Sequence, residues 1–479
     1  MRPERKEWSE QFSEWFHRVI FEAKVYDYRY PVKGMAVWMP YGFSIRRNVL
    51  TIVRNVLESS GHQEVLFPLL IPEDMLRREA EHVKSFEKEV FWVTRGGGEE
   101  LNVKLALRPT SETAIYPMFK LWISSYNDLP IKIYQVVSVF RHETKATKPM
   151  IRVREVTTFK EAHTAHATPE EAEEQVHEAV REYSKIFDTL GIPYLISRRP
   201  DWDKFPGAVY TIAFDTIMPD GRTLQIGTVH NLGQTFSKAF DIKFMKSDGS
   251  YDYVWQTCYG ISERVVAALI SVHGDDHGMV LPPKVAPIHA VVVPIPYKDA
   301  DSKAIFNKAR EACELLNSHG IKAVIDDRPD VTPGSKYFEW ELKGVPVRVE
   351  IGPRDLEKES ATIVKRVDLE KRVCPFKELV NAVERALEEV DLELRDRAWK
   401  FLKDKVYRVE SLKEGKAIIE KRNGIVEMPW CLSESCGRTI EGELNASVLG
   451  HPIEDVDVDG KCVVCGNRAE TLIRVAKTY

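Results

Sequence analysis

The segment spanning residues 133–163 places arginines and a glutamate between two β-rich runs joined by a polar loop. Such runs predict an antiparallel hairpin, and alternation along it would bring charged side chains to one face. Arginine offers planar donors to phosphate oxygens, and a carboxylate accepts from an exocyclic amine. The hairpin suits a polyphosphate with a purine; a hairpin held by cross-strand ion pairs, each worth ~0.2–1 kcal/mol, is the alternative. The side chains concerned are Arg141, Glu143, Arg152 and Arg154.

Two further segments carry polar residues where a strand gives way to a turn or helix. Residues 105–112 lead from a short strand into a helix, with Thr110 or Ser111 as candidate N-cap. Thr110 and Glu112 either cap that helix or bind a ligand. From Gln225 to Gln234 the glycines permit close backbone approach, and Gln225, Thr228 and His230 alternate with them. The alternative there is a simple bend.

Arg264 lies in the first turn of a helix that follows the strand at 253–258. The helix dipole disfavours a cation at this end. A bound anion would remove the conflict, as would pairing with a neighbouring carboxylate.

The seven cysteines fall into two groups. Cys258, Cys313 and Cys374 are isolated, and each is expected to be a buried small hydrophobe. The other four form C-x4-C and C-x2-C, a pattern that resembles a four-thiolate zinc site with no open position for water. These are Cys431, Cys436, Cys462 and Cys465.

Composition describes an ordinary globular chain of 479 residues, 43% hydrophobic and 29% charged. This length predicts two to four domains. No apolar run approaches the ~20 residues that span a bilayer, and the start lacks the apolar core of a signal peptide, which predicts a cytoplasmic protein without membrane contact. The net charge of −5 argues against a non-specific nucleic-acid coater.

The elements expected to position these residues begin with amphipathic helices at 8–24 and 42–60 and an edge strand at 64–70 interrupted by Pro68. That helix and strand form either a dimer interface or a solvent-facing edge. A helix at 169–190 and strands at 194–197, 209–216 and 223–229 follow.

A proline-rich connector at 281–287 marks a domain boundary. Beyond it strands and helices alternate, which predicts a compact α/β domain with largely parallel strands. A charged tail begins as a helix through Lys405 and closes on the four cysteines. The expected domains are residues 1–282, 283–390 and 391–479.

Taken in order, the motifs resemble those of class II aminoacyl-tRNA synthetases, and among them the prolyl-tRNA synthetases of the archaeal and eukaryotic type. Residues 42–68 are similar to motif 1, Phe140-Arg-His-Glu with the returning strand to motif 2, and Gly260-Ile-Ser-Glu-Arg to motif 3. The resemblance covers essentially the whole chain. The prolyl assignment rests on Arg108-Pro-Thr-Ser-Glu, His163-Thr-Ala-His, Lys204-Phe-Pro-Gly-Ala, Gly227-Thr-Val-His-Asn-Leu-Gly-Gln and Trp340-Glu-Leu-Lys-Gly-Val-Pro-Val-Arg.

This resemblance implies an α+β fold: a class II antiparallel sheet flanked by helices, an α/β anticodon-binding domain and a small zinc-binding C-terminal domain. It implies a homodimer that activates L-proline with ATP and Mg²⁺ to prolyl-adenylate, then transfers proline to the 3′ end of tRNA(Pro). Attack by a carboxylate on the α-phosphorus needs alignment and charge neutralisation rather than a protein nucleophile.

The residue roles follow from the same resemblance. The catalytic pair is Arg141, which bridges the prolyl carboxylate and the α-phosphate, and Arg264. The ATP site comprises Arg141, Glu143 at the adenine amine, Arg152 and Arg264 at the outer phosphates, Gln225 beside Mg²⁺, Thr228 and Ser262. The proline site comprises Thr110, Glu112, Arg141, Phe159, Glu161, His163, Phe205 and His230. The anticodon residues are Trp340, Glu341 and Lys343, for which a charged surface helix is the alternative.

Several features bear on this resemblance. The returning strand has Arg154-Glu-Val where class II enzymes usually place a phenylalanine on adenine, so the stacking residue is unassigned. His163 and His166 are expected to be structural rather than general bases. No room remains between His163 and Gln225 for the editing insertion of many bacterial prolyl enzymes. The chain ends on a tyrosine, as in the family.

Two alternatives compete with the prolyl assignment. The first is another class IIa synthetase, such as a threonyl or glycyl enzyme. Threonyl enzymes need an active-site zinc held by histidine and cysteine, whereas here the clustered cysteines lie far from the motifs. A synthetase-like regulatory protein would usually lose the nucleotide arginines, and Arg141, Arg152 and Arg264 are all present.

Overall fold

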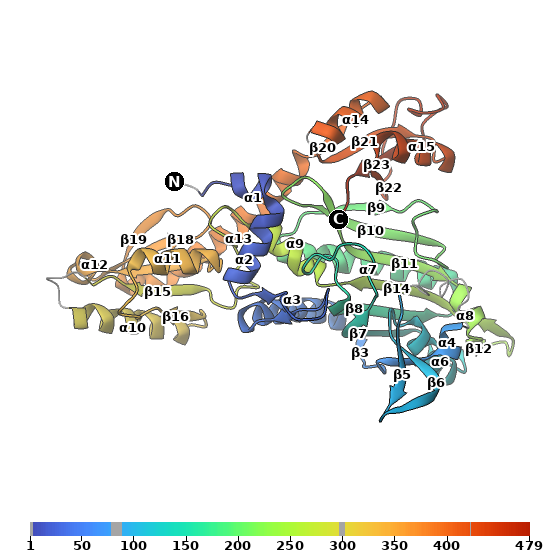
Figure 1. Cartoon of the computed structure of the whole chain (residues 1–479), viewed down its shortest axis with the longest axis horizontal. Helices are drawn as coiled ribbons and strands as arrows, with labels where there is room; N and C mark the ends of the chain where they lie inside the picture. Colours follow the sequence, from blue (N-terminus) through green and yellow to red (C-terminus); the bar gives the residue numbers. More distant parts are fainter. Residues whose placement is uncertain (1–2, 78–88, 297–301, 422) are drawn as a thin grey trace.

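A computed structural model describes residues 3–77, 89–296, 302–421 and 423–479, and its centre is one 11-stranded sheet (Figure 1). Neighbouring strands are antiparallel except at the two ends of the sheet, which confirms the predicted α+β class. In spatial order the strands are β20 (Val406–Arg408), β21 (Ile425–Trp430), β23 (Thr471–Ala476), β22 (Ser447–Pro452), β9 (Leu195–Arg198), β10 (Tyr210–Ile217), β11 (Thr223–Gly233), β14 (Trp255–Ile261), β8 (Glu155–His166), β7 (Ile131–Phe140) and β3 (Gln63–Glu64).

The predicted hairpin is β7 paired with β8, but its strands are shorter than the charged segment. β7 ends at Phe140 and β8 begins at Glu155, so Arg141, Glu143 and Arg152 lie in the connecting loop. The prediction that these residues share a face by strand alternation was therefore wrong. They are held by loop contacts, among them the bond from the Arg141 amide to the Arg154 carbonyl oxygen at 2.8 Å.

Helices pack against one face of the central strands and form its main core. Helix α7 (Pro169–Leu190) begins and ends as predicted: Thr168 Oγ1 accepts from the Glu171 amide, and Gly191 ends the helix with φ of 67°. Helix α9 (Arg264–His273) has nine buried residues, from Val265 to His273. The remaining helices of this half are α1 (Lys6–Glu10), α2 (Phe12–Glu22), α3 (Pro40–Ser59), α4 (Glu73–Arg77), α6 (Glu112–Trp122) and α8 (Thr235–Ala239).

The strand predicted at 64–70 does not form as one element. Only Gln63–Glu64 (β3) and Leu70–Pro72 (β4) are strands. Between them, side chains satisfy the backbone: the Phe67 amide donates to Gln135 Oε1 at 3.0 Å, and Arg108 Nη1 donates to the Phe67 carbonyl at 2.8 Å. β4 instead joins β5 (Phe91–Gly96) and β6 (Glu99–Leu107) in a three-stranded sheet.

The following domain carries a five-stranded sheet beside the catalytic half (Figure 1). Two strand pairs are parallel and two antiparallel, so the prediction of largely parallel strands was wrong for the second half of this sheet. Its strands in spatial order are β16 (Ala323–Ile325), β15 (Ala290–Pro294), β17 (Val347–Ile351), β18 (Ser360–Lys365) and β19 (Lys371–Pro375). Its helices are α10 (Ser302–Ser318), α11 (Pro333–Leu342), α12 (Pro353–Glu357) and α13 (Leu379–Lys403).

Helix α13 connects this domain without a break to the C-terminal segment, where α14 (Leu412–Lys421) and α15 (Glu434–Leu444) cover β20–β23. β22 pairs with β9, with His451 opposite Arg198, so the C-terminal strands extend the catalytic sheet. Arg474 Nη1 reinforces this seam by donating to the Ile196 carbonyl at 2.7 Å. Among the described residues, no helix is both long and apolar enough to cross a membrane.

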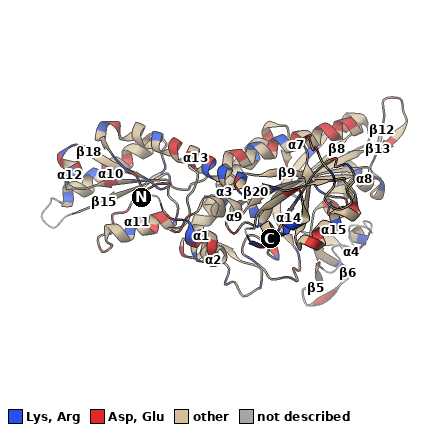
Figure 2. Ribbon diagram, turned by 90° about the horizontal axis from the view of Figure 1, so that it is seen from above, with Lys and Arg blue, Asp and Glu red and all other residues tan. Residues whose placement is uncertain are grey.

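The junction between the catalytic half and the five-stranded domain is polar and buried. Seen from above, the two halves lie side by side with acidic and basic residues interspersed on their helices (Figure 2). Arg366 donates to both carboxylate oxygens of Asp275 at 2.6 and 2.7 Å, and these side chains are 1% and 0% exposed. Tyr41 Oη donates to the Lys343 carbonyl at 3.0 Å. The end of α11 is thereby fixed against the catalytic half.

Removing one partner of this buried pair should destabilise the protein strongly. Arg366→Ala leaves the Asp275 carboxylate uncompensated, which costs about 3–5 kcal/mol. We expect a clear fall in the thermal midpoint, followed by circular dichroism. Arg438→Ala is the control, because Arg438 and its partner Glu434 are 57% and 56% exposed and such pairs contribute about 0–1 kcal/mol. Equal effects of the two substitutions would contradict the prediction.

Candidate active site

A cavity of about 500 Å³ opens over strands β8, β11 and β14, beneath the loop that joins β7 to β8. Its lining draws on segments that are far apart in the sequence. The predicted site residues found in it are Thr110, Glu112, Arg141, Glu143, Arg152, Phe159, Glu161, Phe205, Gln225, Thr228, His230, Ser262 and Arg264.

Three half-buried guanidinium groups, those of Arg141, Arg152 and Arg264, converge on this cavity. Arg141 Nε donates to the Pro109 carbonyl at 3.1 Å, and Arg264 Nε donates to the Ile151 carbonyl at 2.8 Å. Burial, together with the charges of Arg141 and Arg152, lowers the pKa of Arg264 to about 10. Like charges gathered in this way create a site for an anion with several negative oxygens.

Glu143 and Arg152 are close but weakly paired, with 3.9 Å between Oε2 and Nε. Arg154 contacts the Glu143 carbonyl oxygen through Nε and Nη2 at 3.4 and 3.3 Å. Unlike Arg141, Glu143 and Arg152, Arg154 does not line the cavity. It supports Glu143 from behind.

The other end of the cavity is lined by carboxylates and rings. Thr110 Oγ1 donates to Glu112 Oε2, and Ser111 binds Glu161 through its amide and hydroxyl at 3.2 and 2.6 Å. The rings of Phe205 and His230 lie 4.7 Å apart between centroids. Such a slot suits a small, largely apolar ligand with one cationic group. Ser111 precedes helix α6 as predicted, but its hydroxyl binds Glu161 rather than capping the helix.

His163 is the one predicted pocket residue that does not line the cavity. Its side chain is fully buried under the floor. The Nδ1 atom lies 3.1 Å from Tyr116 Oη, and Nε2 faces Glu161 Oε2 at 3.5 Å. The structure therefore places His163 beneath the residues that would touch a ligand.

Arg199 is a lining residue that the sequence motifs did not indicate. It donates to Asp215 Oδ1 at 2.8 Å, to Gln225 Oε1 at 3.0 Å and to the Leu449 carbonyl at 2.6 Å. It thus orients Gln225 and ties the site to strand β22. The one available sequence signal was the pair of arginines that ends the strand at 194–197.

Cys258 also lines the cavity, although it was expected to be only a buried small hydrophobe. It is 7% exposed, and its Sγ lies 3.6 Å from Glu112 Oε1 and 3.8 Å from His163 Nε2. Burial, together with Glu112, raises the pKa of the thiol well above its ordinary value. The argument from cysteine position concerned only the four clustered cysteines, and it did not consider Cys258, which reaches the cavity.

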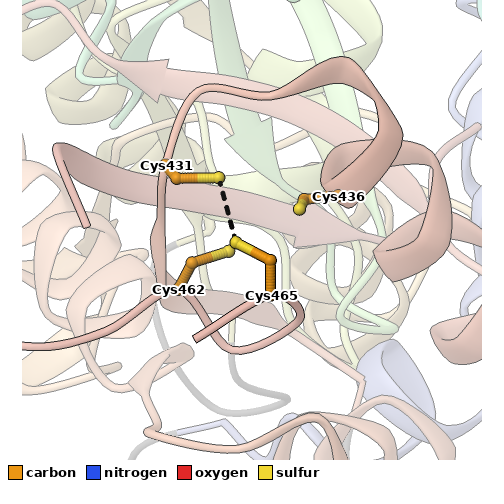
Figure 3. A group of neighbouring side chains, drawn as sticks. All are labelled: Cys431, Cys436, Cys462 and Cys465. Atoms are coloured by element: carbon orange, nitrogen blue, oxygen red, sulfur yellow. Dashed lines mark hydrogen bonds between the residues drawn. The ribbon is translucent and has the colours of Figure 1, made fainter. Parts of the chain in front are cut away.

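The four clustered cysteines lie in the C-terminal domain, around β21, α15 and the loop before β23 (Figure 3). Their sulfur atoms all lie within 4.8 Å of one another, and the Sγ atoms of Cys431 and Cys465 are 3.7 Å apart. Tetrahedral zinc with Zn–S bonds of about 2.3 Å requires sulfur separations of roughly 3.8 Å. The donor set therefore fits one zinc ion.

The predicted anticodon residues lie at the end of α11 and are engaged with neighbours. Trp340 Nε1 donates to Asp326 Oδ2 at 2.8 Å, and Lys343 Nζ lies 4.6 Å from the centroid of the Trp340 ring. Glu341 accepts from Arg348 at 2.6 Å and pairs with His277 at 2.8 Å. Trp340, Glu341 and Lys343 thus form one cluster near the domain junction.

Three family models match the chain in succession. Residues 91–273 match the tRNA synthetase class II core domain of the G, H, P, S and T enzymes, residues 289–386 an anticodon binding domain, and residues 412–479 the C-terminal domain of prolyl-tRNA synthetase. The core match and the cavity over the antiparallel sheet define a class II aminoacyl-tRNA synthetase.

Full-length relatives identify the amino acid. The chain is 56% identical to the proline–tRNA ligase of Saccharolobus islandicus and 57% identical to that of Metallosphaera sedula, with 100% of each chain covered. The prolyl-tRNA synthetase of Giardia lamblia with prolyl-adenylate superposes with a TM-score of 0.95 at 38% identity over 100% of both chains. The Cryptosporidium parvum enzyme with L-proline and AMP gives 0.92 at 33% identity over 100% of this chain and 97% of that one.

The chain belongs to the prolyl-tRNA synthetases. Its reaction is the ATP-dependent activation of proline and the charging of tRNA. The segment between β8 and β11 contains α7, β9 and β10 with their connections, and all of it is described, so no inserted editing domain interrupts the core.

Glu263 lies beside the site and provides a test of its electrostatics. Its Oε2 accepts from the Thr157 amide at 2.9 Å and from Oγ1 at 2.7 Å, while Oε1 is buried with no hydrogen-bond partner. Burial raises the pKa of Glu263 from 4.5 to about 7. The carboxyl group is therefore more easily protonated in the folded chain than in the unfolded chain.

Between pH 4.5 and pH 7 the folded chain holds a proton that the unfolded chain releases, so this group's stabilisation falls as the pH rises. Glu263→Gln removes that dependence. We expect the difference in thermal midpoint, variant minus parent, to increase as the pH rises from 5 to 8. The control is Glu170→Gln, at an exposed position of α7, whose thermal midpoint should change with pH as that of the parent does. If the thermal midpoints of Glu263→Gln and the parent changed with pH in the same way, the raised pKa of Glu263 would be refuted.

Proposed function

We propose that the cavity carries out proline activation with ATP at its arginine-lined end and proline at its carboxylate-lined end. Arg141 bridges the prolyl carboxylate and the α-phosphate, and Arg152 and Arg264 neutralise the outer phosphates. The carboxylate oxygen attacks the α-phosphorus and pyrophosphate leaves, so no protein nucleophile is required. The observation that carries this proposal is the convergence of three guanidinium groups from separate segments on one cavity.

The proposed nucleotide contacts follow the lining of the arginine end. Glu143 accepts from the adenine amine, and Thr228 and Ser262 border the nucleotide. Gln225 would supply an amide oxygen beside the Mg²⁺ that accompanies ATP, and the ion would neutralise phosphate charge there. Arg199 keeps that side chain in place. A carbonyl oxygen from a neutral amide suits Mg²⁺, so this position fits the ion.

The proposed proline contacts lie at the other end. Glu112, held by Thr110, receives the secondary ammonium of proline, with His230 at the same pocket. Phe159, Glu161 and Phe205 wall the ring. His163 contributes from below by holding its neighbours rather than by touching substrate.

Replacing Arg141 should abolish adenylate formation without unfolding the protein. We expect Arg141→Ala to lower proline-dependent pyrophosphate exchange by about 10²–10³-fold or more, as for loss of a group that stabilises transition-state charge. Arg372→Ala, at a 48%-exposed position on β19 of the five-stranded domain, should retain exchange. Circular dichroism checks that both variants are folded. Retained exchange in Arg141→Ala would refute its role.

We also propose that the three matched regions divide the work. The supporting observations are the family models within residues 1–282, 283–390 and 391–479, although helix α13 runs through the second boundary.

Trp340, Glu341 and Lys343 read anticodon bases of tRNA(Pro), which suits single-stranded bases meeting aromatic and charged groups. Zinc at Cys431, Cys436, Cys462 and Cys465 is structural, because four thiolates leave no position for water. The enzyme works in the cytoplasm.

The enzyme is proposed to act as a homodimer through the region around residues 66–70. Leu66 is 80% exposed, and nearby in the fold Phe67 packs on Trp122 with 5.7 Å between ring centroids. Leu121 is 71% exposed and Trp122 44%. Large exposed apolar side chains gathered in this way mark an interaction surface.

Placing a charge on this surface should weaken the dimer. We expect Leu66→Lys to shift the mass measured by light scattering toward the monomer. The dimer dissociation constant should rise at least ~10-fold, which is equivalent to about 1.4 kcal/mol. Val373→Lys is the control, because Val373 is 68% exposed on β19 of the other domain. An unchanged dimer in Leu66→Lys would place the interface elsewhere.

A further inference from the structure

Three metal-ligating side chains meet at the floor of the carboxylate-lined end of the cavity. Glu112 comes from α6, His163 from β8 and Cys258 from β14. All three are buried, and one ligand atom of each lies within 4.8 Å of the other two. None belongs to the four-cysteine cluster, so this is a second, separate set of donors.

The separations match a zinc coordination shell. Cys258 Sγ lies 3.6 Å from Glu112 Oε1 and 3.8 Å from His163 Nε2. With a Zn–S bond of about 2.3 Å and Zn–N or Zn–O bonds of about 2.0–2.1 Å, tetrahedral angles require separations of roughly 3.6 Å. A small closure of the side chains would bring all three donors to bonding distance.

Neighbouring groups hold these donors as the second layer of a metal site does. Tyr116 Oη lies 3.1 Å from His163 Nδ1, which orients the ring with Nε2 toward Cys258. Thr110 Oγ1 binds Glu112 Oε2 and leaves Oε1 facing the sulfur. Glu161 adds a carboxylate 3.5 Å from His163 Nε2, and this negative charge favours a cation. Outer partners of this kind fix ligand geometry and tautomer.

The position left for a fourth ligand opens toward the cavity. Glu112 and Cys258 line it, whereas His163 lies below. A site with three protein ligands and one open position is the arrangement of exchangeable zinc rather than of a closed structural site.

We propose that Glu112, His163 and Cys258 bind one zinc ion in the free enzyme, and that zinc and proline exclude each other. Zinc displaces the proton of the Cys258 thiol, which passes to solvent, and bonds to the resulting thiolate. The exclusion rests on the proposed role of Glu112, because one carboxylate cannot serve zinc and the prolyl ammonium together. Zinc at this site inhibits proline activation.

Zinc content of the whole protein tests the site. The parent, Cys258→Ser and the control Cys374→Ser are dialysed to equilibrium against buffered zinc and analysed by mass spectrometry for metal. We expect Cys258→Ser to bind one zinc fewer than the parent, and Cys374→Ser to equal it, because Cys374 lies on β19. The four-cysteine cluster contributes equally to all three. Equal zinc in the parent and Cys258→Ser overturns the proposal, and thermal unfolding confirms that both variants are folded.

Competition tests the second half of the proposal. A non-hydrolysable prolyl-adenylate analogue should release one zinc from the parent and none from Cys258→Ser. Added zinc should raise the KM for proline in pyrophosphate exchange in the parent at least ~10-fold more than in Cys258→Ser. Zinc that stays bound in the presence of the analogue overturns the exclusion. The difference in zinc content is measured without any enzyme activity. A failure of the proposed residue roles would therefore appear in a different experiment, as pyrophosphate exchange that survives Arg141→Ala.

Discussion

The mutual repulsion of three arginines in a confined space is the constraint on which the rest of this structure depends. Burial, and then the nearby charges of Arg141 and Arg152, lowers the pKa of Arg264. Holding these charges together costs free energy unless an anion lies between them. Backbone carbonyls at Pro109 and Ile151 keep two of the side chains in position meanwhile. A rigid floor of antiparallel strands is needed to hold this geometry, because the arginines cannot hold themselves together.

Local signals in the sequence were sufficient for the best-marked helices, of which α7 is one. Helix α7 carries its own N-cap, proline and terminal glycine, and these act without tertiary help. Residues 65–69 failed as a strand because Gln135 and Arg108, distant in sequence, satisfy their backbone groups. Such pairings have no local signature. The order of the motifs along the chain indicated Arg141 and Arg152, but it did not predict that both lie in the loop between β7 and β8.

The same limit explains why Arg199 and Cys258, two of the residues that line the cavity, were missed. Arg199 acts through Asp215, Gln225 and Leu449, which lie on three different strands, so its role exists only in the folded sheet. Cys258 looked like an isolated core residue because Glu112 and His163 reach it from 146 and 95 residues away.

The absence of an inserted editing domain bears on accuracy. A pocket that excludes larger side chains discriminates against the smaller alanine by only ~1–3 kcal/mol. Mischarging of tRNA with alanine is therefore either tolerated or corrected by another protein.

The seam between β22 and β9 has a consequence for how the enzyme is made. Strand β23, which carries the seam residue Arg474, is synthesised after every other strand of the sheet. Strand β22, which pairs with β9, is made only shortly before β23. Until β22 emerges from the ribosome, β9 has an uncovered edge, and exposed edges recruit other chains. Arg199 likewise lacks its Leu449 partner until β22 docks. Chains that end before β22 therefore lack both a covered edge on β9 and the Leu449 contact that holds Arg199, so the catalytic sheet and its cavity are finished only when the C-terminal strands have been made.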